Sequence, residues 1–491
     1  MTALSRYSTA IAWAILLWLL LMAFAHPVSH DESQYVAATA LVARGLLPYR
    51  DFAYLQTPLQ PFIFAPLAWT SVGALLVMSR LANATLAGAT LALVYSAARR
   101  GGADRGAALA ASILLLTSHA FLWASGVARN DMLPAALLTA ALWVEMRGKR
   151  RLQHWVAGAA LGLAAAAKVS YALPAAAVPI ALFMDKYPAE RRSAIWLCFG
   201  ALVGSSPAVL VAFTSPHAFL FEVFTFGLEG PGRWYRELGE DWMLGPFRFA
   251  YLLGVAAMGP ALLAAVTVAV RVAKAPHRWL QDRQRRLLVG AMLGEVVSAA
   301  LNRPFNTPYL VPALPPLFIL IALELTEQRL PPPTLRVAGA ASIAIGLVWP
   351  ASCLGEAAIH GRFQLVDAEQ RSKEIKRALQ ANDVEGPVAG LTGQYLVDSG
   401  HPLDARFAAG PFLFRSVGLL PAEQAREWHI VTWDQYAALA SSPPGAIITG
   451  GEANKRVEPD LRLAAIAASL GYRPVAHVRK YTIWRRTPAG P

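Results

Sequence analysis

Apolar segments long enough to cross a membrane recur along this chain and set the first expectation of its structure. Runs of about 17 to 25 residues match the length that a helix needs to span roughly 30 Å of hydrocarbon. Run length and flanking charge together predict eleven transmembrane helices. We expect them near residues 9–25, 78–97, 106–122, 132–146, 154–169, 171–184, 194–213, 247–270, 286–301, 307–326 and 335–353. The first run shows no small-x-small cleavage site and is followed by further spans, which indicates an uncleaved signal anchor.

The segment after the first run begins with a helix signal. Ser29 followed three residues later by Glu32 is typical of a capping box. Apolar residues then recur at helical spacing up to the stop at residues 45–48, at Val36, Ala40, Ala43 and Leu47. This pattern predicts an amphipathic helix lying in the membrane interface. Residues 58–77, interrupted by Pro61 and Pro66, predict a second segment along the membrane.

The pattern changes at about Gly361. Alternating and short apolar runs bounded by turn residues predict strands at 387–391, 445–449, 474–478 and 481–485. Helical periodicity predicts helices at 368–381 and 461–470. The expected fold class is therefore an all-α polytopic membrane bundle, with amphipathic helices in its first outer loop, and a small C-terminal α/β domain. The domain boundaries are 1–360 and 361–491.

Composition supports a membrane protein and excludes a nucleic-acid-binding one. The chain is 56% hydrophobic and 15% charged, whereas soluble proteins have about 25% charged residues. Its net charge is +13, and most of the excess lies in short clusters between the predicted spans, at 99–100, 147–151, 191–192 and 271–286. Such clusters mark cytoplasmic loops, so the N-terminus is predicted inside and the C-terminal domain outside. The two cysteines, Cys198 and Cys353, provide neither a disulfide framework nor a metal-binding spacing.

Three carboxylates on the predicted outer side are candidates for catalysis. Asp31 and Glu32 stand where the chain leaves the first span, and Asp131 begins the fourth. An ordinary explanation exists for each, because acidic residues at a helix start stabilise the helix dipole or cap it. The alternative is a carboxylate pair that accepts a proton from a hydroxyl nucleophile, supported by Asp131 from the same face.

Three further groups on this face are candidates for binding a phosphate. Lys168 ends an Ala- and Gly-rich span, and Arg303 and Tyr309 open the tenth. A lysine at a helix end commonly extends to the headgroups, which is the competing explanation for Lys168. A guanidinium, an ammonium and a phenol gathered together would hold a phosphate at the membrane boundary. Glu295 lies within a predicted span, where acidic residues usually have a function, but its role is open.

No cofactor is predicted. The sequence contains no Walker loop, no GxSxG and no HExxH. His30 beside Asp31 and Glu32 leaves a divalent cation as the less favoured alternative to a polar residue at an interface.

Together these segments resemble the GT-C superfamily of polyprenyl-phosphate-dependent glycosyltransferases, and within it the aminoarabinose transferase and protein O-mannosyltransferase group. The similarity covers about residues 10–330, and the tail matches only in kind. It rests on five motifs, His30-Asp-Glu-Ser-Gln-Tyr35 with the run to Pro58, Ser79-Arg-Leu81, Arg129-Asn-Asp131, Gly162-Leu-Ala-Ala-Ala-Ala-Lys168, and Arg303 with Pro308-Tyr-Leu-Val-Pro-Ala-Leu-Pro315.

The resemblance implies a role for each site residue. Asp31 would be the catalytic base or the group that orients the acceptor, with Glu32 beside it and Asp131 in support. Basic and tyrosyl groups would bind the lipid phosphate, namely Lys168, Arg303, Tyr309, Arg80 and Arg129. Many relatives have lysine where Arg303 stands, which leaves its contact open.

The resemblance also implies a function and a location. The chain would transfer a sugar with inversion from a polyprenyl-phosphate donor to a hydroxyl or amine on the periplasmic face of a bacterial inner membrane. The acceptor, whether glycan, lipid or protein, and the sugar stay open. The alternatives are a transporter or flippase of a lipid-linked solute, which would place its ionisable groups near the midplane, and a non-enzymatic envelope assembly protein that binds a partner through its tail.

Overall fold

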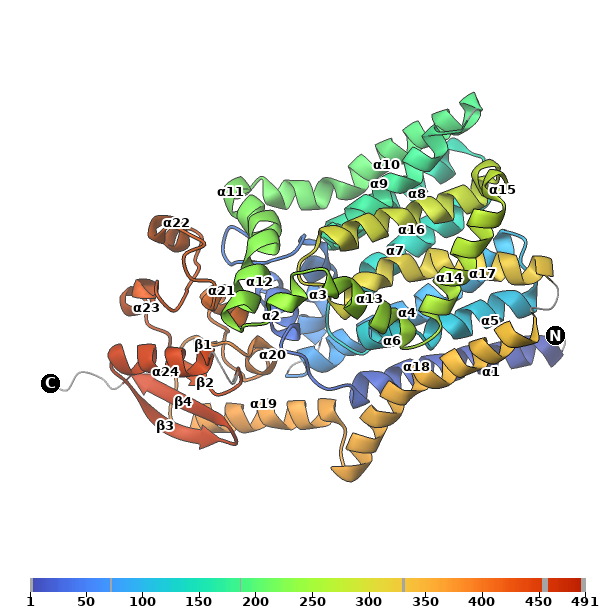
Figure 1. Cartoon of the computed structure of the whole chain (residues 1–491). Coiled ribbons are helices and arrows are strands. Elements are labelled where there is room, and N and C mark those ends of the chain that lie inside the picture. The colour runs from blue at the N-terminus through green and yellow to red at the C-terminus, as the bar shows by residue number, and fades with distance from the viewer. Residues whose placement is uncertain (1–2, 71–72, 186, 329–331, 453–457, 487–491) are drawn as a thin grey trace. The chain divides into compact units, whose positions relative to one another are not determined.

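The computed structural model describes residues 3–70, 73–185, 187–328, 332–452 and 458–486, and these divide into two units (Figure 1). The helical unit comprises Met1–His26, Leu81–Ala208 and Gly245–Gly361. The mixed unit comprises Pro27–Arg80, Val209–Leu244 and Arg362–Pro491. Three separate stretches of chain therefore contribute to each unit.

The helical unit is built almost wholly from apolar helices. Its elements, some continuing into the neighbouring stretch, are α1 (Ala3–Ala25), α4 (Leu75–Arg100), α5 (Arg105–Leu116), α6 (His119–Ser125), α7 (Met132–Glu145), α8 (Arg151–Ala167), η1 (Val169–Tyr171), α9 (Ala172–Phe183), α10 (Pro188–Ala212), α13 (Phe247–Ala257), α14 (Ala261–Lys274), α15 (Pro276–Gln281), α16 (Arg283–Leu301), η4 (Thr307–Ala313), α17 (Leu314–Gln328) and α18 (Pro333–Ile359).

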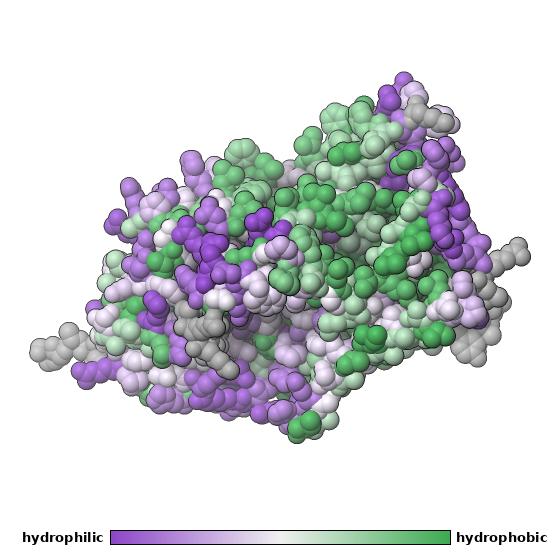
Figure 2. Space-filling model, viewed as in Figure 1, coloured by the Kyte–Doolittle hydropathy of each residue, from purple (hydrophilic) through white to green (hydrophobic). Residues whose placement is uncertain are grey.

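Each of the eleven predicted spans is helical over most of its length, so these helices are confirmed. By length and apolar composition, four described helices can cross a membrane, or six if each of two bent pairs counts as one span. Both pairs correct a prediction of a single helix. The predicted helix at 106–122 is α5 and α6, bent by 69°, and the one at 247–270 is α13 and α14, bent by 103°. Apolar side chains cover the visible face of this unit around α10, α14 and α16 (Figure 2). Exposed apolar residues of these helices include Leu202 of α10, Val266 of α14 and Val297 of α16, which suits contact with lipid.

Helices α8 and α10 pack at unusually close range. Gly158 and Gly162 on α8 face Gly200 and Gly204 on α10, at the same four-residue spacing. A Cβ atom at Gly158 would overlap the carbonyl oxygen of Leu197, and each of the other three would meet a backbone oxygen in the same way. Small residues spaced in this manner let two helices in a membrane pack backbone to backbone.

The mixed unit combines helices with the only sheet among the described residues. Its elements are α2 (Glu32–Ala43), α3 (Leu59–Thr70), α11 (Pro216–Leu220), η2 (Phe221–Thr225), α12 (Phe226–Glu237), η3 (Asp241–Met243), α19 (Gln364–Ala381), β1 (Val388–Gly390), α20 (Gly393–Leu396), η5 (Ala405–Phe407), α21 (Pro411–Phe414), α22 (Ala422–Glu427), α23 (Ala437–Ser441), β2 (Ala446–Thr449), α24 (Pro459–Ser469), β3 (Tyr472–Val478) and β4 (Tyr481–Arg486).

The C-terminal elements follow the sequence pattern. All four predicted strands and both predicted helices of this stretch are present. The sheet has the order β1-β2-β4-β3, with β1 parallel to β2 and the other pairs antiparallel. Buried residues such as Ile447, Leu463 and Phe407 form the core beside it. The short helices between β1 and β2 were not predicted.

Helix α2 corrects the prediction of an amphipathic interface helix. It begins at Glu32 as expected and ends at Ala43, with Gly45 at a φ of 86°. However, ten of its twelve residues are buried, including the polar Ser33, Gln34 and Thr39. It packs against α3 and α20 within the mixed unit, so no face of it is left for the membrane interface. Pro61 and Pro66 do not interrupt α3 either.

Candidate active site

The start of α2 presents two adjacent carboxylates in different environments. The side chain of Asp31 is 27% exposed, whereas that of Glu32 is fully buried. The backbone N–H of Ser29 donates to Glu32 Oε2 at 2.8 Å, which confirms one arm of the predicted capping box. The Ser29 hydroxyl accepts from the N–H of Asp31 at 3.3 Å rather than from that of Glu32. Local hydrogen bonds therefore fix Glu32 inward and leave Asp31 at the surface.

Arg80 holds Glu32 from α4. Its Nε and Nη2 donate to the two carboxylate oxygens at 2.8 and 2.7 Å. Nη2 also donates to the carbonyl oxygen of Pro27 at 3.0 Å. Such a two-pronged pair is rigid as well as strong. Since Arg80 and Glu32 are both fully buried, the pair fixes the loop that carries Asp31.

A second carboxylate, Asp131, lies in an ionic cluster of the helical unit. It occupies the N-cap position of α7, but its side chain makes no cap hydrogen bond. Instead Arg129 Nε donates to Asp131 Oδ2 at 3.1 Å, and Lys168 Nζ donates to Oδ1. The ordinary explanation of Asp131 as a helix cap is therefore wrong. Asp131 and Lys168 are 1% and 4% exposed, so the expectation that Lys168 extends to the headgroups is wrong as well.

Neutral side chains hold the loop that bears Asp131. The amide of Asn83 donates to the carbonyl oxygens of Val127 and Arg129 at 2.6 and 2.7 Å. The amide of Asn130 donates to the carbonyl oxygen of Ala167 at 3.0 Å, directly before Lys168. Fixing the loop in this way positions Arg129 and Asp131 against the end of α8.

Tyr309 and Glu295 complete the surroundings of Lys168. The ammonium lies 5.6 Å from the centre of the Tyr309 ring, and Glu295 is close enough to influence its charge. Glu295 is buried, and neither of its carboxylate oxygens has a hydrogen-bond partner among the described residues. The predicted grouping of Lys168 with Tyr309 is therefore present in the structure.

Arg303 is not part of this cluster. Its side chain is exposed, and it contributes positive charge to the surroundings of Arg248. The described part of the chain shows no hydrogen bond or ion pair from Arg303 to Lys168 or Tyr309. Among the same residues no group of three or more His, Cys, Asp or Glu side chains could hold a metal ion.

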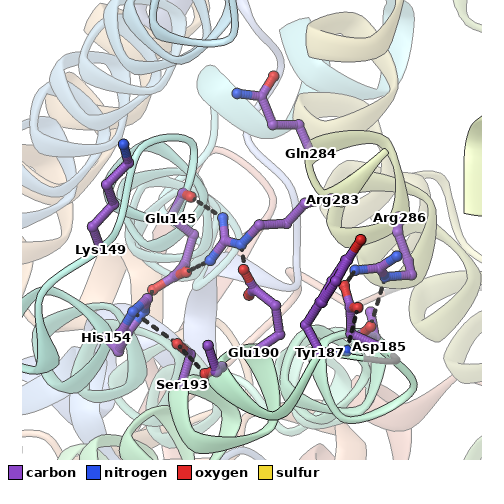
Figure 3. A network of polar contacts seen from close by, with 12 residues as sticks. Glu145, Lys149, His154, Asp185, Tyr187, Glu190, Ser193, Arg283, Gln284 and Arg286 are labelled. Atoms are coloured by element: carbon purple, nitrogen blue, oxygen red, sulfur yellow. Dashed lines mark hydrogen bonds and ion pairs between the residues drawn. The ribbon is translucent and has the colours of Figure 1, made fainter. Parts of the chain in front are cut away.

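Another buried network lies at the opposite end of α7, where sequence patterns indicated only basic loops (Figure 3). Glu145 pairs with His154 at 2.8 Å and with Arg283 at 2.6 Å. Ser193 Oγ lies 3.0 Å from the other ring nitrogen of His154. Arg283 also pairs with Glu190 at 2.8 Å. This network joins α7, α8, α10 and α16, and it lies within the helical unit.

Removing the central acid of this network should destabilise the protein. Glu145→Ala leaves His154 and Arg283 without their buried partner, which costs about 2–3 kcal/mol once the partial exposure of Arg283 is allowed for. The midpoint of thermal unfolding in detergent should fall by several degrees. Glu229→Ala removes an exposed pair with Arg233 and is the matched control, with little expected change. Equal unfolding midpoints for Glu145→Ala and Glu229→Ala would show that the network does not stabilise the fold.

The mixed unit also contains a buried acid that the sequence did not single out. Glu222, in η2, is fully buried, and its Oε2 accepts the N–H of Tyr54 at 2.7 Å. Burial raises the pKa of Glu222 well above its usual range. Its surroundings include the ring of Tyr49, also buried. Glu222 is 168 residues from Tyr54 in the chain, and no local spacing indicates such a contact.

The fold is similar to two structures of ArnT from Cupriavidus metallidurans. The one bound to undecaprenyl phosphate has 17% identity and a TM-score of 0.65, and the apo structure 18% and 0.66; each match covers 100% of both chains. The Pmt1-Pmt2 complex of S. cerevisiae, bound to its sugar donor, matches over 43% of this chain and 34% of that one, with 16% identity and a TM-score of 0.35.

A search of curated proteins found no match. The model of Glycosyltransferase family 87 matches residues 54–303, which is just over half of the chain. The matched segment includes Arg80, Arg129, Asp131 and Lys168 and ends at Arg303. The fold, the apolar helices and this match agree that the chain is a multi-pass membrane protein of GT-C type. It is a member of glycosyltransferase family 87.

Proposed function

We propose that this glycosyltransferase takes its sugar from a polyprenyl-phosphate donor and transfers it to a hydroxyl or amine acceptor with inversion. The single observation that carries the proposal is the buried cluster at Asp131, where two cations meet one carboxylate. The lipid tail would lie in the bilayer beside the apolar helices, and the phosphate would meet the cluster. One relative of the same fold has been solved with undecaprenyl phosphate bound.

The cluster has the charge that a phosphate requires. Arg129 and Lys168 together exceed Asp131 by one positive charge, and an ammonium has three protons to donate. In a buried site with little water, such a charge stabilises the departing phosphate strongly, so no general acid is required. We assign Lys168, Arg129 and Tyr309 to the phosphate. Arg303, exposed and apart from the cluster, is proposed to meet the donor only at the membrane boundary.

Asp31 is proposed as the catalytic base. It is the member of the Asp31-Glu32 pair that remains partly exposed, so a substrate can reach it. The acceptor O–H or N–H would lose its proton to Asp31 as the oxygen or nitrogen attacks the anomeric carbon and the bond to phosphate breaks. Glu32 and Arg80 position the loop instead of touching substrate, and Asp131 supports the phosphate-binding cations. No metal is required by this scheme.

The same proposal includes a topology. The eleven helical segments would all cross a bacterial inner membrane, with the N-terminus in the cytoplasm. Residues 1–360 would form the catalytic domain and residues 361–491 a periplasmic domain. A site on the outer face suits a lipid-linked donor, because nucleotide sugars are confined to the cytoplasm.

Comparative mass spectrometry of envelopes tests the proposal directly. Glycolipids and glycans would be compared between cells with the gene, without it, and with the Lys168→Met variant. We expect one product to lose the mass of a sugar both in the deletion strain and in the variant. The mass would identify the sugar, and the molecule that bears it would identify the acceptor. Accumulation of a solute in vesicles with no covalent product would favour a transporter instead, and a phenotype from deleting 361–491 with no donor consumed would favour an assembly protein.

A further inference from the structure

His30 lies between two carboxylates that belong to distant parts of the chain. Its Nε2 is 3.0 Å from Asp31 Oδ1, and its Nδ1 is 3.8 Å from Glu452 Oε2. The ring of Phe412 meets the imidazole edge to face, with centroids 5.6 Å apart. Glu452 and Phe412 both come from the C-terminal stretch of the mixed unit. The C-terminal stretch thus contacts His30, whose side chain is 49% exposed, directly before Asp31.

This contact is part of an extensive junction within the mixed unit. A Cβ atom at Gly410 would overlap the hydroxyl oxygen of Ser33, and one at Gly393 would approach the carbonyl oxygen of Ser33 at 3.1 Å. Gly410 also has a φ of 58°, a conformation that favours glycine. Because the C-terminal stretch is packed this tightly against the first turn of α2, the placement of Glu452 beside His30 belongs to the same packed arrangement.

We propose that His30 and Glu452 form a positioning pair for Asp31, so that the C-terminal domain contributes directly to the chemistry of the transferase. The inference rests on the proposed role of Asp31 as base. Both ring nitrogens of a histidine can donate only when the imidazole is protonated. Asp31 lies at hydrogen-bond distance from Nε2, and Glu452 lies at ion-pair distance from Nδ1, so the two negative charges favour the imidazolium. The imidazolium donates from Nε2 to Asp31 Oδ1 and so orients the carboxylate that receives the acceptor proton.

The arrangement resembles a catalytic triad, but the base is a different group. In a triad, a buried carboxylate orients a histidine that serves as base. Here Glu452 orients the histidine, and the histidine orients the carboxylate that serves as base. His30 and Glu452 are thus positioning residues, and only Asp31 touches the substrate.

The surroundings of Glu452 act on its carboxyl group in opposite directions. Burial raises the pKa of Glu452, and His30, Arg415 and Lys480 oppose that rise while Asp460 adds to it. The Arg415 guanidinium is partly buried, and desolvation lowers its pKa to about 10, so it stays cationic at neutral pH. The backbone N–H of Glu452 donates to the Asp460 carboxylate, which fixes the main chain at this point.

The pH dependence of transfer separates this role from a structural one. Initial rates would be measured in membranes containing the full-length protein and their endogenous lipid-linked donor, with the glycosylated product followed by mass spectrometry between pH 5 and 9. In His30→Gln, the acidic limb of the pH–rate profile should move to a pH higher by about half to one unit, because Asp31 loses a neighbouring cation. We assign the alkaline limb of the same profile to loss of the His30 proton. In Glu452→Gln, this limb should move to a lower pH by about the same amount, because the imidazolium loses its proton more easily.

The double variant makes the test specific. Since Glu452 acts through His30, the profile of His30→Gln with Glu452→Gln should equal that of His30→Gln alone. Glu374→Gln is the matched control, because Glu374 lies in the same C-terminal stretch but pairs with Arg479 at 2.7 Å. Its profile should equal that of the unaltered protein. Immunoblots would normalise every rate to protein abundance.

Two failures can be told apart. If Asp31→Asn abolishes transfer while both limbs stay in place in His30→Gln and Glu452→Gln, the positioning pair is overturned and the proposed function stands. If Asp31→Asn retains full transfer, the role of Asp31 as base is overturned, and the positioning pair with it. Additive shifts in the double variant would also overturn the pair, because they would mean that Glu452 acts without His30.

Discussion

Asp31→Asn is expected to lower sugar transfer by about 10²- to 10⁴-fold, the contribution of a general base. The amide cannot take the acceptor proton, yet it keeps the size of the side chain and accepts a hydrogen bond from His30. Because Asp31 is partly exposed and lies outside the buried Glu32–Arg80 pair, folding and membrane abundance should be unchanged. The glycosylated product would be measured by mass spectrometry in a deletion strain that expresses each variant.

Asp241→Asn is the matched control for this change. Asp241 is an exposed aspartate of the same unit, and the described residues give its side chain no ion pair. Its variant should restore the product to the level of the unaltered gene. A loss of transfer in both variants would point to an effect on expression, and normal transfer by Asp31→Asn would remove that residue from the mechanism.

Lys168→Met is expected to affect both stability and transfer. It leaves Asp131 buried with Arg129 as its remaining ionic partner, and breaking a buried pair costs about 3–5 kcal/mol. It also removes the ammonium proposed to stabilise the phosphate, so transfer should fall by about 10²- to 10³-fold per folded molecule. Thermal unfolding in detergent and the transfer rate, normalised to folded protein, measure the two effects separately.

Combining Lys168→Met with Asp131→Asn separates the two effects further. The double variant removes both charges, so it should recover part of the lost stability, limited by Arg129 remaining in the cluster. Transfer should stay low, since the ammonium is still absent. Recovery of transfer together with stability would mean that Lys168 serves only the fold and does not bind phosphate.

Local patterns predicted much of the fold because the elements concerned are periodic over short stretches. The C-terminal strands at 446–449 and 481–486 have alternating or continuous apolar residues bounded by turns, and they form as expected. The burial of α2 could not be predicted in the same way. Its polar residue Ser33 lies against Gly393 and Gly410, more than 350 residues further along the chain, and the pattern of α2 itself contains no sign of them.

The site shows the same limit. Sequence placed Asp131 and Lys168 on one side of the membrane, which is consistent with their contact across 37 residues. It offered helix capping for Asp131 and headgroup contact for Lys168 as alternatives, because only tertiary structure reveals that both side chains are buried. The partners of Glu145 and His30 were missed for the same reason. Arg283 is 138 residues from Glu145, and no motif links Glu452 to His30.

The glycine contacts between α8 and α10 have a consequence for the geometry of catalysis. Lys168 follows the last residue of α8, six residues or about 9 Å beyond Gly162 along the helix axis. The backbone contact with α10 therefore fixes the direction in which α8 runs toward Lys168. A side chain at any of the four glycines would push the two helices apart, tilt α8 and displace the ammonium of Lys168. The position of the ammonium proposed to bind phosphate is thus set by the smallest residues of the bundle, about 9 Å away along the helix.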